Sequence, residues 1–119
     1  MTTQQQILLD ALTEAGWELA ATDQLHEWWA DDAWLMRSVW SPQGQQFFLT
    51  FLVDPQLELH RKRKQGEGVW AVSASADLPT SRLQFEGQIL LSLGHGWAKR
   101  VSSFVSDVSR FRHEAVSNQ

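Results

Sequence analysis

The chain has 119 residues, of which 43% are apolar and 20% charged, a composition typical of one folded domain over residues 1–119. It contains no Cys, which excludes disulfides, thiolate metal sites and Cys nucleophiles. No apolar run approaches the roughly 20 residues that a membrane-spanning helix needs. The amino terminus lacks the basic and apolar regions of a secretory signal, so we expect a cytoplasmic protein with no membrane partner.

Charge is distributed unevenly along this chain, whose formal net charge is −4. The first 32 residues contain seven acidic residues and no Lys or Arg. Four of the ten basic residues form one run, Arg61, Lys62, Arg63 and Lys64. Such segregation can orient a protein toward a charged partner, although a solvated acidic face and a solvated basic loop are the simpler interpretation.

The first predicted element is a helix that ends before Gly16. Thr3 and Gln6 have the spacing of a capping box, apolar residues recur at helical spacing from Ile7 onward, and Gly16 favours a C-terminal stop. From Trp17 the period changes to two, which predicts a short strand. Residues 25–29 favour a second short strand that ends in a turn at Asp31–Asp32.

The middle of the chain predicts more strands joined by turns. Residues 33–40 and 46–53 form a hairpin around a turn at 41–44, and residues 54–68 form a long basic loop. Further strands are expected over 69–76 and over 83–93, the second of them kinked at Gly87.

An amphipathic helix from Trp97 to Phe111 follows, and the tail 114–119 is expected to fray. The fold class is therefore α+β: an antiparallel sheet of four to six strands built from hairpins. We expect the N-terminal and the C-terminal helix to pack on one face of it.

In the central hairpin, both the odd-numbered and the even-numbered positions of each strand are largely apolar. A sheet that is covered on one face should instead alternate apolar with polar residues. Two helices cover only one face, so the second face needs a cover of its own. The candidates are the loop 54–68, a second copy of the chain, another protein or a ligand, unless the Trp side chains close over themselves as a second small core.

Seven Trp residues are unusual in a chain with no Tyr, and four of them crowd residues 28–40. Trp is enriched in the energetic centres of protein interfaces. We therefore predict a non-catalytic interaction module that forms a homodimer or binds a protein partner. The predicted binding residues are Trp28, Trp29, Trp34, Trp40, Arg61, Lys62, Arg63 and Lys64.

Two other binding functions stay open. An aromatic sheet face beside a basic loop is also used to stack single-stranded nucleic acid, but the acidic domain as a whole argues against this. A small molecule could instead bind between the sheet and the helices, near Trp97 and Phe104.

No motif predicts catalysis or a cofactor. The sequence from His26 to Ala30 begins like a zinc-protease helix, but Ala30 stands where the second His ligand is required. No glycine-rich phosphate loop or nucleophile elbow is found, so we expect no enzyme activity, no metal and no cofactor.

Overall fold

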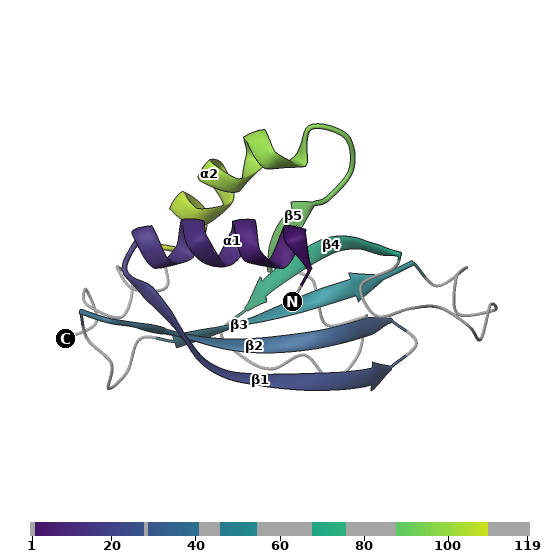
Figure 1. Ribbon diagram of the computed structural model, residues 1–119, viewed down its shortest axis with the longest axis horizontal. Helices are drawn as coiled ribbons and strands as arrows, with labels where there is room; N and C mark the ends of the chain where they lie inside the picture. Colours follow the sequence, from purple (N-terminus) through teal and green to yellow (C-terminus); the bar gives the residue numbers. More distant parts are fainter. Residues whose placement is uncertain (1, 28, 41–45, 55–67, 76–87, 110–119) are drawn as a thin grey trace.

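The computed structural model describes residues 2–27, 29–40, 46–54, 68–75 and 88–109. It confirms the α+β class: a five-stranded antiparallel sheet in the order β1-β2-β3-β4-β5, with a helix from each end of the chain against it (Figure 1). The elements are α1 (Thr3–Glu14), β1 (Trp17–Glu27), β2 (Ala30–Ser38), β3 (Gln46–Val53), β4 (Val69–Ser75), β5 (Ile89–Ser92) and α2 (Trp97–Val108).

Helix α1 begins one residue earlier than the capping pattern suggested. Thr2, not Thr3, is the N-cap, and its Oγ1 accepts a hydrogen bond from the backbone N–H of Gln5 at 3.1 Å. The Gln5 side chain accepts the reciprocal bond from the Thr2 N–H at 3.0 Å. At the other end, Gly16 has φ +90°, which confirms the predicted glycine stop because few L side chains adopt that backbone conformation.

The predicted turn at Asp31–Asp32 is wrong, since both residues lie inside strand β2. The chain reverses earlier, between the end of β1 and the start of β2, and Trp29 lies in that turn. Asp32 tolerates a buried strand position because its carboxylate accepts a hydrogen bond from Gln5 Nε2 at 2.9 Å. The two short strands predicted before residue 30 are therefore one long strand, β1.

Several of the remaining predictions fall outside the described residues. These are the turn 41–44, most of the loop 54–68, residues 83–87 of the predicted last strand, and the tail 114–119. The described part of that last strand, β5, pairs antiparallel with β4, as a run of hairpins predicts.

Both helices cover the same face of the sheet (Figure 1). The main core is buried between them and the strands, and its largest side chains are Trp17, Trp34, Phe47, Phe51 and Phe104. The ring of Trp17 meets that of Phe47 edge to face with centroids 4.7 Å apart, a favourable aromatic geometry. The amphipathic stripe of α2 thus packs as its periodicity predicts.

Candidate functional site

The structure separates the Trp residues that the sequence crowds together. Trp34 is 3% exposed and packs edge to face on Phe51 in the main core, beneath the helices. Trp29 is also buried, but in a small cluster on the opposite face of the sheet with Ala30, Leu52, Ala71 and Leu25. Trp40 follows β2 and is 69% exposed. These three residues therefore do not form one aromatic face.

The other predicted binding residues have no described position. Trp28, Arg61, Lys62, Arg63 and Lys64 all lie outside the residues that the structure describes. Phe104 is buried in the main core and Trp97 packs against it. Binding of single-stranded nucleic acid, or of a small molecule between sheet and helices, stays a prediction.

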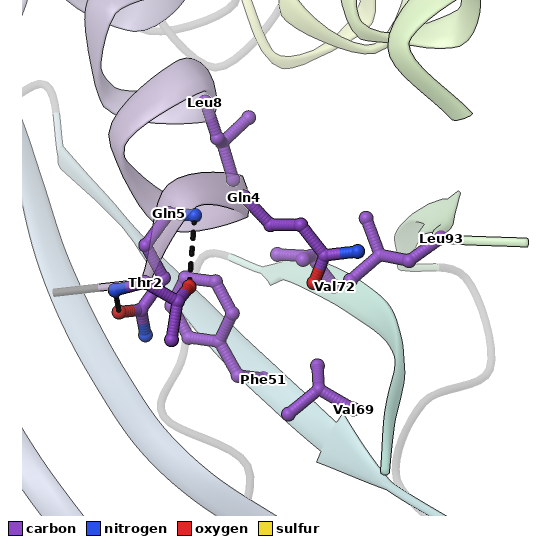
Figure 2. A pocket seen from close by; sticks show the side chains of 8 residues that line it. All are labelled: Thr2, Gln4, Gln5, Leu8, Phe51, Val69, Val72 and Leu93. Carbon is purple, nitrogen blue, oxygen red and sulfur yellow. Dashed lines mark hydrogen bonds between the residues drawn. The ribbon is translucent and has the colours of Figure 1, made fainter. Parts of the chain in front are cut away.

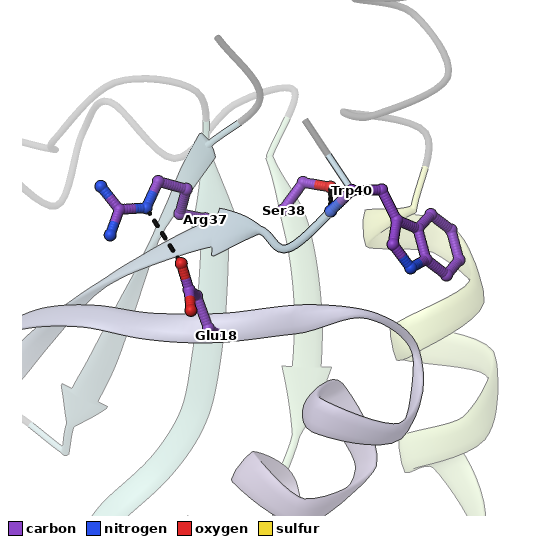
Figure 3. A network of polar contacts seen from close by, with 4 residues as sticks. All are labelled: Glu18, Arg37, Ser38 and Trp40. Carbon is purple, nitrogen blue, oxygen red and sulfur yellow. Dashed lines mark hydrogen bonds and ion pairs between the residues drawn. The ribbon is translucent and has the colours of Figure 1, made fainter. Parts of the chain in front are cut away.

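Trp40 is held in a defined position although most of its side chain is exposed (Figure 3). Its backbone N–H donates to Oγ of the buried Ser38 at 3.2 Å, and the N–H of Val39 donates to the carbonyl of Gly16 at 2.9 Å. The indole lies over the turn between α1 and β1, where a Cβ on Gly16 would stand 2.8 Å from Trp40 Cζ2. Only glycine leaves room for the ring at this turn.

An ion pair lies beside this turn. Arg37 Nε donates to Glu18 Oε1 at 3.2 Å, and the two residues face each other across the β1–β2 ladder (Figure 3). Both side chains are more than 40% exposed, so the pair contributes little to stability. The pair projects from the face opposite the helices, whereas the indole lies over Gly16. Because all four residues lie at the same end of the β1–β2 ladder, we call Glu18, Arg37, Val39 and Trp40 together the Trp40 surface.

A narrow pocket opens at the start of α1 (Figure 2). Leu8, Phe51, Val69, Val72 and Leu93 form its apolar walls, and Thr2, Gln4 and Gln5 supply the polar groups. None of these side chains is ionisable. The Gln5 amide already bonds Thr2 and Asp32, so its polar atoms hold α1 against β2. The polar side chains of this pocket therefore have a structural role, and its described lining residues offer no group for acid–base or metal chemistry.

The face opposite the helices is buried at its centre within the single chain. Thr50 and Ala71 are 0% exposed there, and Ser73 is 1% exposed. The Ser73 hydroxyl donates to Gln88 Oε1, whereas the Thr50 hydroxyl has no hydrogen-bond partner in the structure. The centre of the second face is thus shielded without a second copy of the chain.

Within the described ranges, no three His, Asp or Glu side chains come together as a group that could bind a metal ion. Nor does any helix in those ranges combine the length and the apolar character needed to cross a membrane. No known family model matches the sequence, and neither the curated proteins nor the solved structures contain a match. Any functional proposal must therefore be argued from the residues themselves.

Proposed function

We propose that this protein is a non-catalytic interaction module that self-associates through the Trp40 surface. The observation that carries this proposal is Trp40 itself, a large apolar side chain that is 69% exposed and yet held over a turn. Val39, next to it, is 47% exposed, so two apolar side chains are presented side by side in sequence.

The fixed position of Trp40 favours binding for an energetic reason. A side chain that is immobilised on association loses about 0.5–1.5 kcal/mol of rotamer entropy. Because the indole already lies on the Gly16 turn, part of that ordering has occurred before a partner arrives. Trp is also among the residues that contribute most to binding energy when they are buried in an interface.

A second copy of the chain is the partner that the charges favour. A two-fold dimer brings the same surface of each protomer together, so the surface has to be complementary to itself. The Trp40 surface carries one acid and one base, Glu18 and Arg37, in an exposed pair. Across a two-fold axis, Arg37 of one copy can bond Glu18 of the other without leaving a charge unpaired.

The mass in solution, measured by light scattering over a range of concentrations, tests this proposal. We expect the wild-type protein to approach twice the 13.6 kDa of one chain as concentration rises, and Trp40→Ala to stay at 13.6 kDa. Trp70→Ala is the matched control, because Trp70 is 37% exposed on β4 and lies outside the Trp40 surface. A wild-type monomer at every concentration, or an unchanged Trp40→Ala dimer, would overturn the proposal.

A mixing experiment tests the charge arrangement separately. Arg37→Glu and Glu18→Arg each place like charges across the two-fold axis, so each variant alone should dimerise more weakly than wild type. An equimolar mixture restores both opposite-charge pairs in the heterodimer. Recovery of the dimer on mixing supports this arrangement of the two-fold interface, and no recovery would contradict it.

A further inference from the structure

The face opposite the helices contains a hollow over β1, β2 and β3, next to the Glu18–Arg37 pair. Its cavity volume is about 150 Å³, enough for a ligand of the size of benzene. The residues that line it are Ala21, Thr22, Asp23, Ala33, Trp34, Leu35 and Phe48.

Two small side chains explain why there is space at this point. Ala21 stands opposite Leu35 in the β1–β2 ladder, and Ala33 stands opposite Asp23. Directly opposed side chains on one face have Cβ atoms about 4.5–5.5 Å apart, so the two alanines are diagonal neighbours. Phe48, which pairs with Leu35 from β3, closes the third side. The gap therefore has an apolar floor and apolar walls.

An irregularity in β1 brings an acidic residue to this hollow. Glu18 faces Arg37, but the register shifts between Leu19 and Ala21. Because of this shift, Ala21 and Asp23 lie on the same face of the sheet as Glu18. Regular alternation along the strand would have placed them on the opposite face. Bulges commonly redirect side chains in this way.

Among the described residues that line the hollow, Asp23 is the ionisable one. Its side chain is exposed, and it forms no hydrogen bond or ion pair with any side chain in the described ranges. Arg37, a basic residue on the same face, is engaged by Glu18. Among the described residues, the hollow thus combines an apolar, partly aromatic interior with one negative charge at its rim that no described basic side chain engages.

We propose that this hollow binds a small organic ammonium ion. The apolar part of the ligand packs on Ala21, Ala33 and Leu35, and the ammonium group bonds the Asp23 carboxylate. Phe48, on β3, adds an aromatic wall for the apolar part of the ligand. An anionic ligand of the same shape is disfavoured by Asp23. None of the four residues of the Trp40 surface is among the described residues that line this hollow.

Titration with benzylammonium, followed through backbone amide NMR shifts, tests the proposal. We expect saturable shifts confined to β1, β2 and β3. The Trp40→Ala protein should give the same result, because that substitution lies outside the hollow. Benzyl alcohol has the same ring without the charge and should bind more weakly, and benzoate should bind least.

Two variants separate the charge from the cavity. Asp23→Asn should weaken benzylammonium binding roughly fivefold and leave benzyl alcohol unchanged, as expected for one partly exposed ion pair. Glu14→Gln is the control, since Glu14 is an exposed acid on α1 and does not line the hollow. Ala21→Leu fills the space from its exposed rim and should weaken both ligands. Absence of saturable shifts, or equal binding by wild type and Asp23→Asn, would overturn the proposal.

Discussion

Substituting Gly16 should reveal how firmly Trp40 is attached to the fold. At φ +90°, Gly16→Ala forces an L side chain into the left-handed region, which costs about 1–2 kcal/mol. The new Cβ would also stand 2.8 Å and 2.9 Å from two Trp40 ring atoms, well inside the usual carbon–carbon contact of roughly 3.5–4.0 Å. The ring must then leave the turn.

The cost of moving the ring is limited because most of it is already in water. Complete burial of a large apolar side chain is worth about 1.5–3 kcal/mol, and Trp40 is 69% exposed. Losing its remaining contact therefore costs about 1 kcal/mol. We expect Gly16→Ala to lower the free energy of unfolding by about 2–3 kcal/mol in total, or the melting temperature by roughly 8–12 °C in a domain of this size.

A double-mutant cycle, measured by urea unfolding with circular dichroism, separates these two contributions. In a Trp40→Ala background, Gly16→Ala should cost only the backbone strain, so the coupling energy should be about 1 kcal/mol. Gly94→Ala is the control, because the nearest atom to its Cβ would be Ser92 Oγ at 3.8 Å, an ordinary contact. An equal cost of Gly16→Ala in both backgrounds would refute the packing of Trp40 on the turn.

Two buried polar groups give further predictions. Thr50→Val should raise the free energy of unfolding by about 1 kcal/mol, because it removes a buried hydroxyl that has no hydrogen-bond partner; a lower denaturation midpoint would show that the hydroxyl is bonded. Gln5→Ala should lower the free energy of unfolding by about 2 kcal/mol, since it removes the bonds to Thr2 and to the buried Asp32 carboxylate. Thr2→Ala removes only the cap and should cost about half as much, so equal losses would contradict the role of the Gln5–Asp32 bond.

The features that the sequence predicts well are those that depend on local periodicity. The apolar stripe of α2 places Val101, Phe104, Val105 and Val108 on one face, and all four are buried. The β2–β3 hairpin is likewise evident from two apolar runs on either side of a turn signal. In α2 the environment of each of these residues follows from its spacing, whereas in the hairpin the apolar runs predict the strands but not the face on which each side chain lies.

The features that were mispredicted depend on contacts between distant residues. The pair Asp31–Asp32 is typical of a turn, but Asp32 is bonded by Gln5, 27 positions earlier in the chain. The capping pattern fits Thr2 with Gln5 as well as Thr3 with Gln6, and nothing local distinguishes the two. Tertiary contacts decide such cases.

The candidate site was harder to predict than the fold because crowding in sequence is not proximity in space. Trp29, in the turn that follows β1, packs on one face of the sheet, and Trp34 packs on the other. Trp40 lies beyond the end of β2. A sequence shows that these residues are close along the chain, but the position of the turn determines the face on which each one lies.

The burial of the second face changes where association is expected. Its centre holds Thr50 and Ser73, small hydroxyl residues that are almost fully buried in the single chain. A dimer formed through this centre would have to uncover polar groups that are already shielded, and it would gain little apolar contact in return. Large apolar side chains remain exposed at the end of the β1–β2 ladder, at Val39 and Trp40. Self-association through that end would bury apolar surface without disturbing either core, and for this reason we propose the interface there.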